Sequence, residues 1–212
     1  IELEGANSPA DVLLTVDAGR LFRAKEAGIL APLESDILTQ RIPAAYRDPD
    51  NQWFGLSLRS RVIMFDKSRV SAAEISRYED LADPRWKGEI CIRSSGNIYN
   101  QSLLASLIEH LGEEATEAWA EGLVANMARR PQGGDRDQIR AAVAGQCKLA
   151  VSNTYYLAGM LNSGVAADIE VAEQIGVIWP NQADRGAHMN VSGAGVISTA
   201  KNPNEARQLI EF

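Results

Sequence analysis

The segment Lys148–Met160, with the sequence KLAVSNTYYLAGM, decides the fold. Residues 148–151 form an apolar run that predicts a buried strand, and Ser152-Asn153-Thr154 predicts a polar turn. A helix is predicted from the two tyrosines onward. The same order of strand, polar turn and helix occurs after Val16 and after Arg93. This order predicts an α/β fold, in which ligands bind outside the carboxyl ends of the strands.

Short apolar runs predict further strands, and these cover residues 11–16, 53–65, 89–93, 176–179 and 190–198. Glycine commonly follows the last turn of a helix. Three predicted helices therefore end at Gly28, Gly112 and Gly145. The last of these is predicted to begin with Asp135 as N-cap and Gln138 completing a capping box. Another helix is predicted to open at Pro203.

The composition limits the classes of function. The chain has 212 residues, 45% of them hydrophobic, which is enough for one large domain or two small lobes. No stretch reaches the roughly 18–20 uninterrupted apolar residues of a membrane span. A net charge of −7 without a basic cluster argues against nucleic acid as a partner. The sequence opens at Ile1 without a signal peptide, so we expect it to be the middle of a longer protein whose export signal lies outside it.

The two cysteines, Cys91 and Cys147, are too few for a disulfide scaffold or for a thiolate zinc site. One lies in a predicted strand and the other at the start of the next predicted strand. A single disulfide between neighbouring strands fits an oxidising compartment. Two buried free thiols fit the sequence equally well, and both alternatives stay open.

Three of the five tyrosines fall at two of the predicted turns, and these are Tyr99, Tyr155 and Tyr156. Adjacent residues at a helix start are about 100° apart, so the pair Tyr155–Tyr156 can reach one site. The positive end of the helix dipole is expected to favour phenolate over phenol there. Phenolate oxygens suit ferric iron, which is small, hard and triply charged, and metal binding displaces the phenol protons.

Other roles for these positions must be weighed. Zinc or copper would require histidine and cysteine ligands. The chain has two histidines, His110 and His188, and His110 is predicted to lie on the surface near a helix end. The residues alone also allow the tyrosines to be half-buried packing residues whose hydroxyls bind water. The choice depends on the surrounding sequence.

The run from Ser152 to Leu161 resembles the iron-binding segment of the ferric-ion substrate-binding proteins of bacterial ABC importers. Further segments that resemble this family are spread along the chain, at residues 8–21, 55–61, 80–88, 92–95 and 185–195. The segment at 80–88 is shared with relatives that bind other ligands, so it indicates the superfamily only. The tyrosine pair with the upstream Tyr99 is more specific.

The resemblance implies an α/β, two-lobed type II periplasmic binding protein fold, with mixed sheets, flanking helices and crossing hinge strands. Residues 1–63 plus 182–212 are expected to form lobe one, with its N-terminal part missing from this sequence. Residues 64–181 are expected to form lobe two. The lobes would close on Fe(III) in the cleft between them.

The same resemblance implies that Tyr99, Tyr155 and Tyr156 are metal ligands. A further ligand near the N-terminus of mature family members is expected to lie outside this sequence. In family members with a third tyrosine, an arginine can hold carbonate or a similar synergistic anion, and that role maps to Arg59, with Arg61 as the alternative. A guanidinium fork suits an oxyanion because it donates two parallel hydrogen bonds.

The expected function is capture of ferric iron by a monomeric protein that is periplasmic, or lipid-anchored and extracytoplasmic, and delivery to the permease of an ABC importer. Catalysis is not expected, because the sequence has no G-x-S-x-G or HExxH motif and Gly193-Ala194-Gly195 lacks the rest of a dinucleotide fingerprint. One alternative keeps the fold and gives Tyr155 and Tyr156 a phosphonate, thiamine, polyamine or oxyanion ligand. A regulatory domain of this fold would need an attached DNA-binding or signalling domain, which the sequence does not show.

Overall fold

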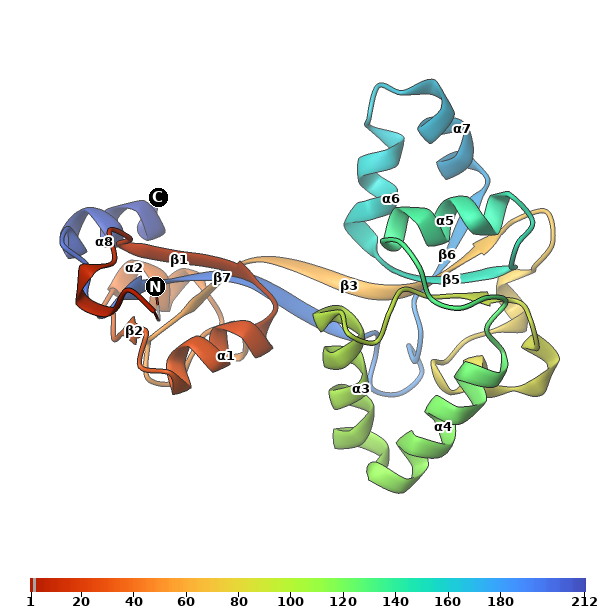
Figure 1. Cartoon of the computed structure of the whole chain (residues 1–212), viewed down its shortest axis with the longest axis horizontal. Coiled ribbons are helices and arrows are strands. Elements are labelled where there is room, and N and C mark those ends of the chain that lie inside the picture. Colours follow the sequence, from red (N-terminus) through yellow and green to blue (C-terminus); the bar gives the residue numbers. More distant parts are fainter. Residues whose placement is uncertain (2) are drawn as a thin grey trace. The chain divides into compact units, whose positions relative to one another are not determined.

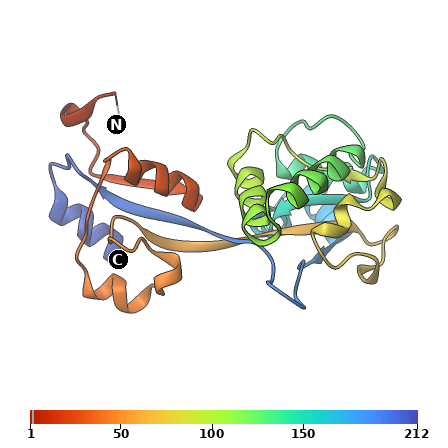
Figure 2. The same cartoon turned by 90° about the horizontal axis from the view of Figure 1, so that it is seen from below.

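The computed structural model describes residue 1 and residues 3–212 (Figure 1). These residues form two compact units. Unit 1 is Ile1–Leu58 with Asn190–Phe212, and unit 2 is Arg59–Met189. The chain passes from one unit to the other along β3 (Phe54–Asp66) and along β7 (Met189–Ile197), as Figure 2 shows. The lobe boundaries expected from the sequence, and the closing of two lobes on iron, stay predictions.

Unit 1 is built on an antiparallel sheet. Strands β1 (Val12–Val16) and β2 (Leu30–Ala31) both pair antiparallel with β7. The helices of this unit are α1 (Ala18–Glu26), α2 (Asp36–Arg41) and α8 (Pro203–Glu211). Its core consists of Leu33, Leu38, Phe54, Ala194, Val196, Ala206 and Ile210. The strand predicted at residues 11–16 and the helix predicted from Pro203 are confirmed.

Unit 2 has a mixed sheet with the strand order β6–β3–β5–β4. Strand β3 is antiparallel to β5 (Leu149–Asn153) and to β6 (Ile175–Ile178), whereas β4 (Ile90–Cys91) is parallel to β5. The helices are α3 (Ile98–Leu111), α4 (Glu113–Ala125), α5 (Asp135–Val143), α6 (Thr154–Leu161) and α7 (Ala166–Glu173).

The two central strands of unit 2 contribute alternate side chains to two apolar cores. The side chains on one face are Ile63, Phe65, Leu149 and Val151. The side chains on the other face are Val62, Met64 and Ala150. Helices α3 and α4 lie on one side of the sheet, and α5, α6 and α7 lie on the other (Figure 1). Because both faces are covered, the strands are continuous apolar runs in the sequence.

The turn predicted at residues 152–154 is wrong, because the strand continues through it. Strand β5 runs to Asn153, and α6 begins at the next residue. Ser152 pairs with Val62, and Asn153 pairs with Arg61, across the sheet. This ladder holds the two polar residues extended and brings the helix start directly to the end of the strand.

The N-cap predicted for α5 is also wrong. Gly134 is the N-cap, and its N–H donates to the Asp137 carboxylate at 2.7 Å. Asp135 is instead the first helical residue, and its carboxylate is fully buried between two arginines. A buried charge needs such partners, and they hold this side chain away from the capping position.

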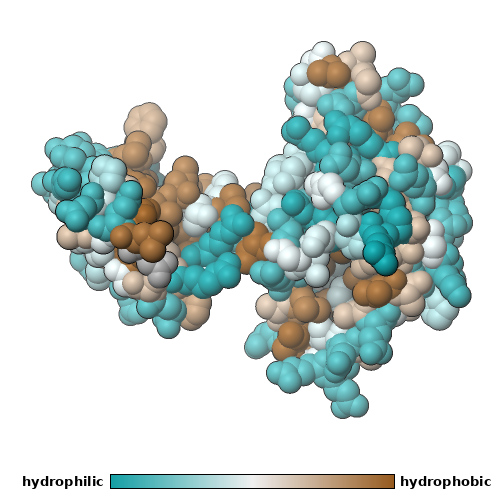
Figure 3. Space-filling view, in the orientation of Figure 1, coloured by the Kyte–Doolittle hydropathy of each residue, from teal (hydrophilic) through white to brown (hydrophobic). Residues whose placement is uncertain are grey.

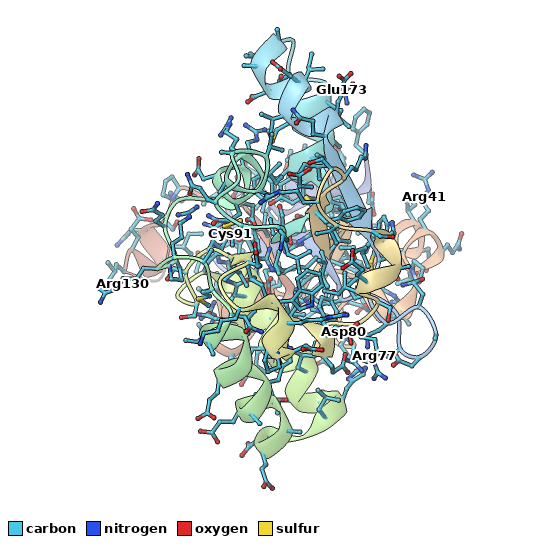
Figure 4. All side chains as sticks on the ribbon, turned by 90° about the vertical axis from the view of Figure 1, so that its right-hand side faces the viewer. Arg41, Arg77, Asp80, Cys91, Arg130 and Glu173 are labelled. Carbon is cyan, nitrogen blue, oxygen red and sulfur yellow. A yellow bond between two sulfur atoms is a disulfide. The ribbon has the colours of Figure 1, made fainter. Side chains whose placement is uncertain are left out.

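Cys91 and Cys147 form a disulfide in the interior of unit 2, where Figure 4 labels Cys91. The bond joins the end of β4 to the segment that leads into β5, with the two Cα atoms 5.9 Å apart. Both residues are buried. Of the two alternatives that the sequence leaves open, the structure has the disulfide.

We expect the variant Cys91→Ala/Cys147→Ala to lose about 4 kcal/mol of the free energy of unfolding. The bridge closes a loop over a sequence separation of 56 residues, so it restricts the unfolded chain. Urea unfolding followed by circular dichroism measures the loss. Full reduction should lower the unfolding midpoint of the wild type and leave that of the double variant unchanged. A wild-type midpoint that ignores reduction would contradict this expectation.

The surface of unit 2 mixes hydrophilic and hydrophobic side chains (Figure 3). Large apolar side chains are exposed on α3 and α4, including Leu104, Ile108 and Val124. Among residues 1 and 3–212, no helix has both the length and the apolar character needed to cross a membrane.

Candidate metal centre

The first turns of α3 and α6 lie at one edge of the sheet in unit 2. Strands β4 and β5 are parallel neighbours, with Ile90 opposite Leu149, so their carboxyl ends meet at that edge. The Asn97 side chain accepts a hydrogen bond from the N–H of Tyr99 and so starts α3. Helix α6 follows β5 without a loop. This is the edge at which α/β sheets bind ligands.

The three tyrosines predicted as ligands come together at this edge. The Tyr155 hydroxyl donates a hydrogen bond to the Tyr99 hydroxyl oxygen at 3.1 Å. The rings of Tyr155 and Tyr156 lie with their centroids 4.3 Å apart and their planes tilted by 35°. Tyr155 is 42% exposed, so a dissolved ion can reach it, and the other two are half-buried. The cluster is therefore a group of phenol oxygens open to solvent.

The pKa of Tyr155 is raised above its ordinary value, first by burial of the ring and then by the hydroxyls of Tyr156 and Tyr99. The expectation that the helix start favours phenolate is therefore wrong for this residue in the metal-free unit. Partial burial of the ring and the hydrogen bonds with two further phenols together favour the neutral form of Tyr155. Tyr155 is thus a neutral phenol at pH 7, and a metal must displace its proton.

Two arginines flank the Tyr99 ring. The guanidinium carbon of Arg59 lies 5.7 Å from the ring centroid, and that of Arg93 lies 5.6 Å from it. Both distances are within the range of cation–π attraction. Arg59 is the residue predicted to hold an anion, and its side chain is buried. The sequence pattern assigns no role to Arg93, although its place at the end of a predicted strand, next to the polar turn, is a signal that could have found it.

Arg61 lies deeper in unit 2 than Arg59 does. Its side chain is 1% exposed, and its Nε, Nη1 and Nη2 atoms all donate to protein oxygens. Because Arg59 lies over the Tyr99 ring, it remains the candidate for holding an anion, with Arg61 behind it.

The structure places the two histidines on α3 and, through a backbone contact, beside β3. His110 lies in the last turn of α3 and is exposed, as predicted. The backbone of His188 pairs with Arg61 of β3. In the part of the chain that the structure describes, no three or more His, Cys, Asp or Glu side chains are grouped so as to hold a metal ion. The candidate ligands at the sheet edge are tyrosine phenol oxygens, which are not among these four residue types.

The sequence is similar to those of known binding proteins along its length. Residues 7–212 match the family described as bacterial extracellular solute-binding protein. Iron uptake protein A1 of Synechocystis sp. is 54% identical over 212 residues, which are 100% of this chain and 59% of that protein. Iron uptake protein A2 of the same organism is 47% identical over 100% of this chain and 62% of its own length. The chain thus spans about three fifths of these relatives.

Solved structures of ferric-ion-binding proteins are also similar to this chain. The FutA protein of Trichodesmium, in complex with iron and citrate ligands, is 53% identical and superimposes with a TM-score of 0.95, over 99% of this chain and 66% of that one. The ferric binding protein of Campylobacter jejuni is 43% identical with a TM-score of 0.96, over 100% of this chain and 67% of that one. The predicted type II periplasmic binding fold is confirmed, and so is the resemblance to ferric-ion-binding proteins.

Proposed function

Because the chain belongs to the family of bacterial extracellular solute-binding proteins, we propose that it captures ferric iron in the periplasm and delivers it to the permease of an ABC importer. Members of this family bind and carry solutes and are not enzymes, in agreement with the sequence, which predicts no catalysis. The observation that carries the proposal is the meeting of Tyr99 and Tyr155 at their hydroxyls, 3.1 Å apart, with Tyr156 beside them.

The proposed ligands are the phenolate oxygens of Tyr99, Tyr155 and Tyr156. Three phenolates neutralise the triple charge of the ion, and hard anionic oxygens match its chemistry. The guanidinium groups of Arg59 and Arg93 add positive charge beside them, which offsets the negative charge of the ligands and of any anion bound with the metal.

The proposed anion-binding residue is Arg59. Its position next to the Tyr99 ring would allow a carbonate or a similar oxyanion to bridge the guanidinium and the metal. The Trichodesmium relative was solved with citrate as well as iron, which supports an oxyanion at such a site. A monomeric state and a location in the periplasm, or on a lipid anchor outside the cytoplasm, belong to the same proposal.

Titration with ferric citrate tests the proposal directly. The expected result is a visible phenolate-to-iron charge-transfer band that saturates at one iron per chain at neutral pH. Titration with Ga³⁺, which has the same charge but no such band, is the optical control. A protein that stays colourless, and that instead binds a phosphonate, thiamine or a polyamine by calorimetry, would replace the iron proposal with the alternative ligand.

A further inference from the structure

Arg61 holds an unusual position among the polar residues of unit 2. Its guanidinium is buried behind the sheet edge that carries the tyrosines, and it donates hydrogen bonds to residues of several elements. Nε and Nη2 donate to Asn100 Oδ1 at 3.0 and 2.6 Å. Nη1 donates to Asp135 Oδ1 at 3.0 Å and to Asn153 Oδ1 at 3.1 Å. Nη2 also donates to the Val151 carbonyl at 3.3 Å.

The three side-chain partners belong to the starts of three different helices. Asn100 follows Tyr99 in the first turn of α3, Asp135 is the first residue of α5, and Asn153 is the N-cap of α6. Helix α3 lies on one side of the sheet, whereas α5 and α6 lie on the other (Figure 1). One planar group therefore connects the helix that presents Tyr99 with the helix that presents Tyr155.

We infer that Arg61 is a positioning residue that sets the separation of Tyr99 and Tyr155 and thereby the geometry in which they receive ferric iron. This inference rests on the proposed function of the tyrosine cluster. Arg61 touches none of the proposed ligand atoms, so its effect is exerted through Asn100 and Asn153, the neighbours of those tyrosines in the chain.

The energetics favour a geometric role over a simple stabilising one. Helix starts carry partial positive charge, so a cation placed at three of them is repelled. The buried pair with Asp135 offsets this cost, but buried ion pairs add little net stability. What arginine supplies is a rigid fork of five donors that fixes several acceptors at set angles, which lysine cannot do.

The backbone of Arg61 is held as firmly as its side chain. Its N–H donates to the His188 carbonyl at 3.1 Å, and its own carbonyl accepts from the Tyr78 hydroxyl. Tyr78 is almost fully buried. The guanidinium therefore projects from a fixed point of β3, and a residue behind the metal ligands that is fixed in this way can hold their spacing.

The chain provides a matched control in Arg69. This arginine is less buried than Arg61, with its side chain 28% exposed, and pairs with Asp66 at 2.8 Å, and its guanidinium donates to the carbonyls of Ala142 and Cys147. Those carbonyls lie near the end of α5 and before the start of β5, at the opposite ends of the elements that Arg61 joins. Arg69→Lys removes a similar fork without touching the tyrosine edge.

The test compares Arg61→Lys with Arg69→Lys. Arg61→Lys keeps the charge and is expected to lower ferric affinity by about 10–100-fold, the cost of losing a residue behind a metal ligand, and to shift the charge-transfer band. Arg69→Lys is expected to keep the wild-type affinity and band. Wild-type affinity with an unshifted band in Arg61→Lys would overturn the inference, and so would an equal loss in Arg69→Lys.

Crystals of the metal-free proteins separate this inference from the proposed function. If the wild type gives no charge-transfer band, the proposed function fails, but the Tyr99–Tyr155 hydroxyl separation still decides the role of Arg61. Separation of the hydroxyls beyond hydrogen-bonding distance in Arg61→Lys supports that role, and retention of the 3.1 Å contact overturns it. If Arg61→Lys does not fold, Asn100→Ala removes the link from Arg61 to α3, together with the Asn100 Nδ2 hydrogen bonds to the Arg93 and Ser94 carbonyls, and is judged by the same measurements.

Discussion

Tyr155→Phe and Tyr156→Phe should each abolish tight ferric binding and leave the fold intact. Each substitution removes one oxygen that would become an anionic ligand and keeps the ring. The affinity should fall by more than about 100-fold, because the group lost is a ligand rather than a residue behind one. The hydrogen bond from Tyr155 to Tyr99 is exposed, so its loss should change the free energy of unfolding by about 1 kcal/mol at most. Competition with a chelator measures the affinity, and thermal unfolding measures the stability.

Tyr46→Phe is the control for these two variants. Tyr46 lies in unit 1, in the 3₁₀ turn Ala44–Tyr46, and has no part in the cluster of Tyr99, Tyr155 and Tyr156. The Tyr46→Phe variant should bind ferric iron with the affinity of the wild type. Full ferric affinity in either Tyr155→Phe or Tyr156→Phe would exclude that tyrosine as a ligand, whatever the spectrum of the wild type.

The meeting of the tyrosines was predictable because it follows from local pattern and one general rule. Two strand-to-helix units place Tyr99 and Tyr155 just after their strands, and parallel neighbours present those ends at one edge. The helix ends at Gly28, Gly112 and Gly145 were predictable in the same way. All three glycines have the positive φ that commonly follows the last turn of a helix. Such features depend on residues close in sequence.

The polar network behind the tyrosines was not predictable from the same patterns. Arg61 meets Asp135 and Asn153 from 74 and 92 residues away, and no periodicity marks such partners. The predicted turn at Ser152 and Asn153 failed for the same reason, since polar residues typical of a turn are held extended by pairing with β3. Helices α2 and α7 are also too short for a helical repeat of apolar residues to be detected in the sequence.

The direction of the Tyr155 pKa shows where the local argument was incomplete. A helix start favours an anion, and the sequence indicates that position correctly. The sequence does not show how much of the ring is buried or that two other hydroxyls surround it, and these effects raise the pKa. The raised pKa of Tyr155 agrees with the expectation from the sequence that the metal displaces the phenol proton as it binds.

Iron should therefore be released as the pH falls, and over a wide range. An ordinary tyrosine loses its proton near pH 10, and the pKa of Tyr155 is raised further, first by burial, so metal-free Tyr155 holds its proton at neutral pH. Each phenol that becomes a ligand releases one proton, and a lower pH favours the protonated, metal-free form. For three such ligands the affinity should fall by about a thousandfold per pH unit.

A proton count provides the sharpest measurement of this dependence. Ferric citrate added to the protein in a pH-stat at neutral pH should release about three protons per iron bound, less the protons that citrate takes up as it gives up the metal, which transfer of the same iron to a chelator of known proton stoichiometry measures. Histidine ligands would behave differently, because an affinity set by them levels off above their pKa near 6.5. Phenol ligands keep the dependence steep from acid through neutral pH to about pH 9. An affinity that is flat across neutral pH, with no protons released, would rule out Tyr99, Tyr155 and Tyr156 as the ligands.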